Sequence, residues 1–265
     1  MINYQNITKE VTLLTQQVSQ YIADQALTFS SEKIEHKGLN DLVSYVDKTA
    51  EMQLVKGLQV ILPEAAFITE ENTIAKQDND LQWIVDPLDG TTNFMHGLPC
   101  YSISIALMHK NELVVGVVHE VNRNESFYAW KDGGAFLNGN PISVSAKLNL
   151  QDSLIATGFP YTVFEEIDDY LTLLKELMKC THGLRRLGSA AVDLAYVAAG
   201  RYDGFFESGL KPWDMAAGAL LITESGGLIG NYRGEEGFLQ SGEVMCANPR
   251  IFAQMVQCLS KYSKC

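Results

Sequence analysis

The sequence predicts an α+β protein in two parts, with helices packed on an antiparallel sheet in the first part and alternating α/β elements in the second. Three observations lead to this prediction. Apolar residues keep helical spacing up to about Pro63, strand-like runs with turn signals occupy residues 101 to 130, and strands alternate with helices after about residue 145. The chain has 265 residues and 46% apolar content, which suffices for a substantial core.

The first part begins with a helix over residues 7–29, whose apolar side chains recur every three or four positions. Ser44 followed by Asp47 resembles a capping box and predicts that a second helix starts there and ends before Pro63. Short strands are expected at 65–69 and 81–85, and a meander of strands at 101–108, 113–121 and 126–130. Turns are expected at 110–111, 132–134 and 138–140.

The second part is predicted to alternate between strands and helices. Helices are expected around 170–178, at 190–199 (closed by Gly200), at 213–225 and at 249–259. Strands are expected at 154–157, 204–207, 228–229 and 243–247. The change of pattern predicts two subdomains, residues 1–145 and 146–265, with the boundary near residues 140 to 150.

Composition argues against several classes of protein. The chain has 20 basic and 32 acidic residues, a formal net charge of −12, and its densest basic cluster is only Arg185 and Arg186, so we expect no nucleic-acid partner. No run approaches the roughly 18 apolar residues of a membrane helix, and the start of the chain does not resemble a secretory signal. Five widely spaced cysteines indicate reduced thiols and a cytoplasmic protein. The five histidines lack the spacing of a zinc site, so any metal is expected to be bound by oxygen.

The most informative segment is WIVDPLDGTTNF, residues 83–94. An apolar strand ends in Asp86, Pro87 turns the chain, and Asp89 follows three residues later. Gly90 permits close approach of the backbone, and Thr91 is typical of a helix start, where free N–H groups favour an anion. Two carboxylates beside a phosphate cradle would repel the phosphate unless hard cations lie between them, and Mg²⁺ suits that arrangement.

Two further acidic positions strengthen this interpretation. Glu70 follows the strand AFIT, and strand ends are where α/β proteins present ligands. Asp214, in KPWDMAAG, stands at a predicted helix start. Taken alone, each Asp could be a helix cap or a turn former, but several such coincidences in one chain favour a metal site.

WIVDPLDGTTNF and KPWDMAAG resemble the two signature motifs of the inositol monophosphatase family, which are Mg²⁺-dependent, lithium-sensitive phosphatases. NDLVSYVDKTAE, FITEEN, GAFLNGNPISVS, RRLGSAAVDLAYVAAGRYDGFFE and TESGGLI extend the resemblance along nearly the whole chain. Thr69 departs from the small residue that many members have before the Glu pair. The resemblance implies a layered αβαβα sandwich of the inositol monophosphatase and fructose-1,6-bisphosphatase type, a homodimer, and metals and substrate between the subdomains.

The resemblance also implies a role for individual residues. Two or three Mg²⁺ ions would be held by four carboxylates and one backbone carbonyl, those of Glu70, Asp86, Leu88, Asp89 and Asp214. Glu70 and Thr91 would orient and deprotonate the attacking water, with Asp47 hydrogen-bonded to Thr91. The amides of Gly90 and Thr91 would bind the phosphate. The residues lining the alcohol side would be Asp89, Gly188, Ser189, Ala190, Glu207 and Asp214. Lys37 matches a basic position near the metals in some members, and it could equally be a solvated surface lysine.

The sequence is compatible with several functions. The segment DPLDGTT differs from the D-x-D-G-T motif of haloacid dehalogenase-like phosphatases in spacing and position, which argues against a covalent aspartyl-phosphate. Within the resemblance, DGTTNF favours an inositol monophosphate as substrate over fructose 1,6-bisphosphate, histidinol phosphate or a 3′-phosphoadenosine nucleotide. A different class of function is a regulatory protein that binds the transcription machinery, as some bacterial relatives do. Glu207 has its own simpler interpretation, an ion pair with Lys211.

Overall fold

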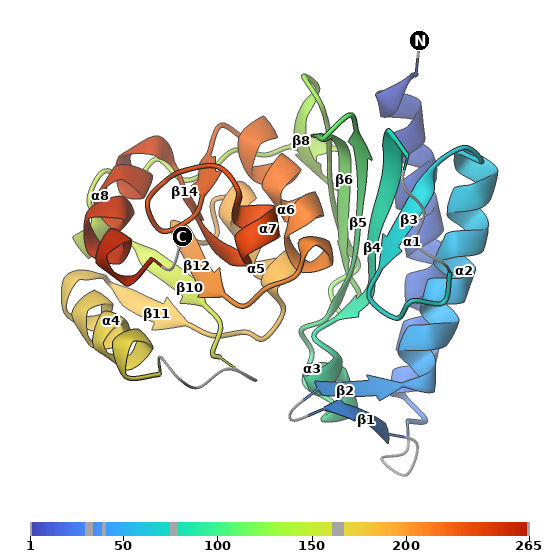
Figure 1. Ribbon diagram of the computed structural model, residues 1–265, viewed down its shortest axis with the longest axis horizontal. Helices are drawn as coiled ribbons and strands as arrows, with labels where there is room; N and C mark the ends of the chain where they lie inside the picture. Colours follow the sequence, from blue (N-terminus) through green and yellow to red (C-terminus); the bar gives the residue numbers. More distant parts are fainter. Residues whose placement is uncertain (1, 30–33, 39–40, 75–78, 161–166, 264–265) are drawn as a thin grey trace.

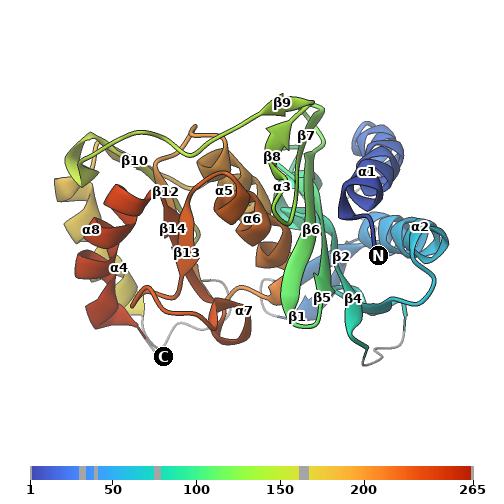
Figure 2. The same cartoon turned by 90° about the horizontal axis from the view of Figure 1, so that it is seen from above.

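The computed structural model describes residues 2–29, 34–38, 41–74, 79–160 and 167–263, and describes side chains in all of these except 34–38 and 41–43. Within these ranges the elements stack as helices, sheet, helices, sheet, helices, which is the predicted αβαβα sandwich (Figures 1 and 2). The α+β prediction is therefore confirmed.

The first helical layer contains α1 (Tyr4–Ala26) and α2 (Tyr45–Ile61), which lie side by side on the outer face of the larger sheet (Figure 2). The helix α2 begins at the capping box that the sequence predicts, since Asp47 accepts a hydrogen bond from the Ser44 amide at 2.9 Å and Val46 N donates to Ser44 Oγ. The apolar faces of both helices, including Val11, Ile22 and Leu54, pack against the sheet in one core cluster.

The larger sheet has seven strands in the order β3-β4-β5-β6-β7-β8-β9. Only β3 and β4 are parallel, and every later pair is antiparallel, as a meander requires. The strands are β3 (Ala66–Thr69), β4 (Leu81–Asp89), β5 (Ser102–His109), β6 (Glu112–Glu120), β7 (Glu125–Trp130), β8 (Gly134–Leu137) and β9 (Asn140–Pro141). A short helix, α3 (Thr91–Met95), follows β4 and lies beside the hairpin of β1 (Ile34–Gly38) and β2 (Asp41–Ser44) (Figure 1).

The middle layer contains α5 (Ala190–Ala198) and α6 (Pro212–Glu224), which are buried between the two sheets (Figure 1). Both helices are rich in alanine, and a Cβ built on Gly218 would lie 2.5 Å from the Leu194 Cβ, so the helices approach very closely. A helix that is apolar on all sides is suited to a fully buried layer. This close packing fixes the N-termini of α5 and α6 relative to the larger sheet.

The smaller sheet has the order β11-β10-β12-β14-β13, and the outer helices α4 (Ile167–Cys180) and α8 (Pro249–Leu259) cover its far face. The pairs β10–β11 and β10–β12 are parallel, whereas β14 is antiparallel to both β12 and β13. The strands are β10 (Leu154–Thr157), β11 (Gly183–Arg185), β12 (Gly204–Ser208), β13 (Leu228–Gly230) and β14 (Glu243–Ala247). The short helix α7 (Phe238–Ser241) precedes β14.

The predicted strands and helices are all present within a few residues of their expected bounds, and the structure adds short ones. β1, β2, β8, β9 and β11 are present although the sequence analysis did not assign them. The subdomain boundary at residues 145 and 146 remains a prediction. It falls between β9 of the larger sheet and β10 of the smaller sheet.

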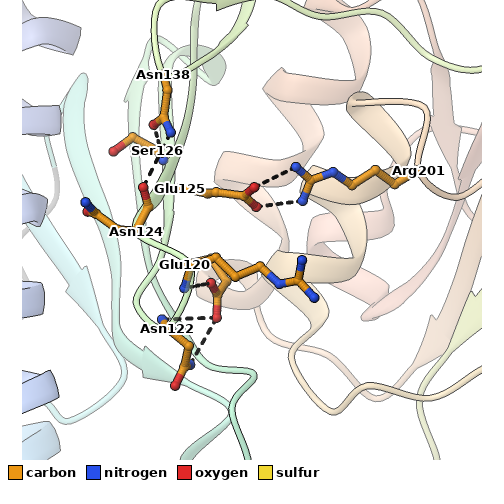
Figure 3. Close-up of polar contacts among 8 residues, drawn as sticks. Glu120, Asn122, Asn124, Glu125, Ser126, Asn138 and Arg201 are labelled. Atoms are coloured by element: carbon orange, nitrogen blue, oxygen red, sulfur yellow. Dashed lines mark hydrogen bonds and ion pairs between the residues drawn. The ribbon is translucent and has the colours of Figure 1, made fainter.

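A polar cluster at the β6–β7 end of the larger sheet links it to the loop after α5 (Figure 3). Arg201 binds both oxygens of Glu125, at 2.6 and 2.7 Å, and its guanidinium lies over the ring of Tyr196. Ser126 N donates to Asn138 Oδ1 at 2.9 Å, which ties β7 to the turn after β8. A bidentate ion pair that also stacks on an aromatic ring is better ordered than an ordinary surface ion pair. It therefore holds β7 of the larger sheet against the loop that follows α5.

His119 on β6 gives the first testable prediction. Its side chain is fully buried, its Nδ1 lies 2.8 Å from Ser126 Oγ, and burial lowers the pKa of its imidazole to about 4. Between that value and the ordinary value of 6.5, the unfolded chain binds a proton that the folded chain does not, so stability falls as pH falls. Between pH 7.5 and pH 5 the wild type should lose about 2 kcal/mol more of unfolding free energy than His119→Asn.

Urea unfolding at the two pH values measures this difference. The exposed His182 supplies the control, because His182→Asn should keep the pH response of the wild type. Equal pH responses for the wild type and His119→Asn would contradict the assignment.

Among the described helices, none has both the length and the apolar character that a membrane span needs.

Candidate active site

The site is built where β4 of the larger sheet ends. The register between β4 and β5 is irregular there: Asp86 pairs with Ser104 and Asp89 with Ser102, so β4 advances three residues where β5 advances two. The Leu88 amide donates to Asp86 Oδ1 at 2.9 Å, which closes a tight turn around Pro87. The strand therefore ends with both aspartates beside the middle helical layer.

Asp214 joins these aspartates from the N-terminus of α6. It occupies the third helical position, where its Oδ2 accepts a hydrogen bond from Lys211 N at 2.7 Å. The Ser104 hydroxyl donates to the Trp213 carbonyl at 2.9 Å and ties β5 to the same helix start. Carboxylate oxygens of Asp86, Asp89 and Asp214 all lie within 4.8 Å of one another.

Glu70 lies on the neighbouring strand end. Because β3 is parallel to β4, with Thr69 opposite Val85 and the Glu70 amide bonded to Val85 O, Glu70 follows at the level of Asp86. The Glu70 carboxyl lies close enough to Asp86 to raise the pKa of that aspartate. The four acids that the sequence predicts to form one group are therefore also close together in the fold.

The pKa values of these acids report strong charge crowding. Burial, followed by the charges of Glu70, Asp89 and Asp214, raises the pKa of Asp86 well above its ordinary value. Burial and the charge of Asp89 raise the pKa of Asp214 to about 8. Clustered carboxylates with these shifts are destabilised as anions unless cations compensate them. A set of oxygen-only ligands of this kind fits Mg²⁺ and offers no soft ligand for zinc.

Thr91 and Asp47 form a hydrogen-bonded pair next to this cluster. The Thr91 hydroxyl lies 2.9 Å from Asp47 Oδ1 and 2.9 Å from the Leu88 carbonyl, so it can donate to either. Asp47 is almost fully buried, and its other oxygen accepts the Ser44 hydroxyl at 2.6 Å. Its carboxylate is therefore held in place by α2 and orients Thr91.

Gly90 makes the turn from β4 into α3 possible. It has φ +95°, and a Cβ there would lie 2.9 Å from the Cys100 carbonyl oxygen. Only glycine tolerates both the left-handed conformation and that contact. The helix start predicted at Thr91 is confirmed, although α3 is only five residues long.

The N-terminus of α5 approaches Asp89 from the second half of the chain. The Ser189 hydroxyl and the Ala191 amide both donate to Asp89 Oδ2, the latter at 2.8 Å. Asn93 links the loop before α5 to the loop after α3 by donating to the carbonyls of Leu187 and Cys100, at 2.8 Å each. The Ser189 hydroxyl is therefore engaged by a candidate metal ligand, and its main effect is to orient that carboxylate.

A cavity of about 360 Å³ opens beside the acids and extends into the second half of the chain. Its lining includes the predicted alcohol-side residues Asp89, Gly188, Ser189, Ala190, Glu207 and Asp214.

Glu207 lies at the end of β12, where burial raises the pKa of its carboxyl to about 8. A Cβ on Gly158 would lie 1.9 Å from the Glu207 carboxyl carbon, so this placement requires glycine at position 158. Among the ion pairs of the described residues, none joins Glu207 to Lys211.

The structure also identifies residues that the sequence analysis did not. Glu51 is buried on α2, one turn after Asp47, and accepts hydrogen bonds from the amides of Glu71 and Thr73 at 2.7 Å each, so it holds the loop that follows Glu70. Asp193 lines the cavity one turn after Ala190. In both cases the available signal was an acid on the same helix face as a predicted site residue. The side chain of Lys37 lies outside the described residues.

Comparisons with known proteins agree with this geometry. The family model described as the inositol monophosphatase family matches residues 3–263. The protein named Nus factor SuhB from Escherichia coli strain K12 is 42% identical over 89% of this chain and 88% of its own length.

Two solved structures share the fold. The extragenic suppressor protein suhB from Bartonella henselae superposes with a TM-score of 0.92 at 36% identity, covering 97% of this chain and 99% of that one. An inositol monophosphatase from Anabaena superposes with a TM-score of 0.88 at 31% identity, covering 98% and 97% of the two chains.

Proposed function

The chain belongs to the inositol monophosphatase family, and from that premise we propose that it is a Mg²⁺-dependent phosphomonoester hydrolase whose substrate is a small phosphorylated polyol, with myo-inositol 1-phosphate as the best candidate. The observation that carries the proposal is the group of three carboxylates with oxygens within 4.8 Å of one another, two of which, Asp89 and Asp214, line a cavity of about 360 Å³. This arrangement supplies cation ligands and room for a polyol in one place.

In this proposal, two or three Mg²⁺ ions are held by Glu70, Asp86, Asp89, Asp214 and the carbonyl of Leu88. Bound Mg²⁺ neutralises the phosphate, lowers the pKa of a bound water and stabilises the leaving alkoxide. Glu70 and Thr91 orient the attacking water, Glu70 accepts its proton, and Asp47 fixes the Thr91 hydroxyl. The amides of Gly90 and Thr91 bind the phosphate oxygens.

Recognition of the alcohol is assigned to the cavity beyond the acids. Gly188 and Ala190 give it small walls, and Glu207 accepts hydrogen bonds from ring hydroxyls. Fructose 1,6-bisphosphate and a 3′-phosphoadenosine nucleotide are the alternative substrates within the family. We further propose a homodimer, which analytical ultracentrifugation tests directly.

Phosphate release from myo-inositol 1-phosphate tests the proposed function. Activity should disappear with EDTA, return with Mg²⁺ and fall with Li⁺, with uncompetitive or mixed inhibition if Li⁺ acts after turnover. No acid-stable phosphoenzyme should form, because water attacks directly. Full activity in EDTA, or a trapped aspartyl-phosphate, would overturn the proposed mechanism.

A second function is supported by the name of a relative. The Escherichia coli protein at 42% identity is called a Nus factor, a name that refers to transcription. A regulatory role in binding the transcription machinery therefore stands beside the enzymatic one, and the expectation of no nucleic-acid partner is correspondingly weaker. Binding to RNA polymerase by an Asp86→Asn variant that has lost phosphatase activity would separate the two functions.

A further inference from the structure

The cavity beyond the metal cluster is acidic on more than one side. Glu207 lines it from the end of β12, Asp193 lines it from α5, and Asp89 lines it from the end of β4. The cation that faces these acids is Arg186, which lowers the pKa of each of them and lies over the Phe159 ring. This distribution of charge favours a ligand that brings hydrogen-bond donors.

Asp193 is the least satisfied of these groups. Its side chain is only 1% exposed, and its Oδ1 has no hydrogen-bond partner among the described residues. Ser189, Ala190 and Asp193 share one face of the first turns of α5, and all three line the cavity. A buried carboxylate oxygen without a partner is strongly unfavourable, so such an atom requires an explanation.

The surroundings of Asp193 argue against an ordinary structural role. Burial, then Glu207 and Asp89, raise the pKa of Asp193 well above its ordinary value, and only Arg186 opposes them. A residue kept solely for stability at this position would be better replaced by an apolar or amide side chain. A ligand that donates a hydrogen bond to Oδ1 would remove the penalty at the moment of binding.

We propose that Asp193 is a specificity-determining residue that, together with Glu207, accepts hydrogen bonds from hydroxyl groups of the substrate, so that the cavity selects polyol monophosphates and rejects alcohols carrying a second phosphate. This inference rests on the proposed phosphatase function and deepens it. Rejection follows from charge once both carboxyl groups are ionised, which for Glu207 means above its raised pKa of about 8, because a second phosphate would then face two negative charges with one arginine to compensate.

The first test compares myo-inositol 1-phosphate with ethyl phosphate, which has no hydroxyl group on its alcohol. Asp193→Asn keeps the shape of the side chain but removes the ionisable carboxyl group, so the comparison is made at a pH above 8. We expect kcat/KM for the inositol ester to fall about tenfold or more, mainly through KM, because charge-assisted hydrogen bonds are lost. For ethyl phosphate, kcat/KM should change at most about twofold. Glu207→Gln should likewise lower kcat/KM for the inositol ester much more than for ethyl phosphate.

The exposed Asp24 on α1 supplies a control, since Asp24→Asn removes the same charge on a helix that does not line the cavity. Thermal unfolding of all variants reports on the fold. Equal losses on both esters would mean that Asp193 supports the fold or the metal cluster, and would overturn the inference. No activity of the wild type on either ester would instead overturn the proposed function itself.

The second test concerns the excluded phosphate. The wild type should prefer myo-inositol 1-phosphate to myo-inositol 1,4-bisphosphate, and Asp193→Asn should narrow that preference by weakening the repulsion. An unchanged preference in Asp193→Asn, or a wild type that prefers the bisphosphate, would contradict selection by this acid.

Discussion

Asp86→Asn is expected to lower kcat by at least about 10³-fold while the protein stays folded. The proposed Mg²⁺ site would supply several kcal/mol of transition-state stabilisation, and each 1.4 kcal/mol is a factor of ten. The amide can still accept the hydrogen bond from Leu88 N, which is 2.9 Å long, so the turn that presents Asp89 should survive. The substitution removes one negative ligand from the group formed with Asp89 and Asp214.

The same variant should be more stable than the wild type when no metal is present. Burial and three neighbouring acids raise the pKa of Asp86, so its charged form opposes folding in the apo protein. We expect the thermal midpoint in EDTA to rise by several degrees in Asp86→Asn. Addition of Mg²⁺ should raise the midpoint of the wild type and leave that of the variant nearly unchanged.

The higher stability of Asp86→Asn in EDTA and its missing response to Mg²⁺ together distinguish a metal site from a structural cluster of acids. If Asp86 only supported the turn, its replacement by an amide that keeps the Leu88 hydrogen bond would leave stability and activity nearly unchanged, with or without Mg²⁺. The exposed Asp24→Asn variant on α1 serves as the surface control. An Asp86→Asn protein that retains more than a tenth of the activity would remove the cluster from the mechanism.

The sequence predicted the elements whose residues carry their own local signal. The capping box of Ser44 and Asp47 marks the start of α2, and the alternating strands of the meander mark most of the larger sheet. By contrast, β11 has three residues and exists through its parallel pairing with β10. A strand that short has no periodicity of its own, and tertiary contacts alone decide it.

The site divides in the same way. Asp86, Asp89 and Thr91 stand within six residues of one another, and a turn explains why they act together. Glu51 and Asp193 lie on helices whose patterns look ordinary, and their importance follows from burial against other elements. The sequence cannot indicate such residues, because it shows that a position is acidic but not which side chains surround it in the fold.

The loss of one hydroxyl in Thr91→Val is expected to lower kcat by about 10²-fold or more, the range in which proton transfer and water orientation contribute. The valine side chain fills the same volume and leaves the backbone amides of the phosphate cradle in place. KM for the substrate and the Mg²⁺-induced shift of the thermal midpoint should therefore change little. Thr91→Ser should recover most of the activity, since it restores the hydroxyl.

Asp47→Asn should produce a related effect for a different reason. The amide group can donate a hydrogen bond to Thr91 Oγ where the carboxylate accepted one at 2.9 Å, so the hydroxyl hydrogen would turn to the Leu88 carbonyl, which is also 2.9 Å away. The amide would then compete with the attacking water for the lone pairs of Thr91 Oγ. A loss in kcat for Asp47→Asn that Thr91→Val does not increase further would place both residues in one chain of hydrogen bonds, whereas additive losses would separate them.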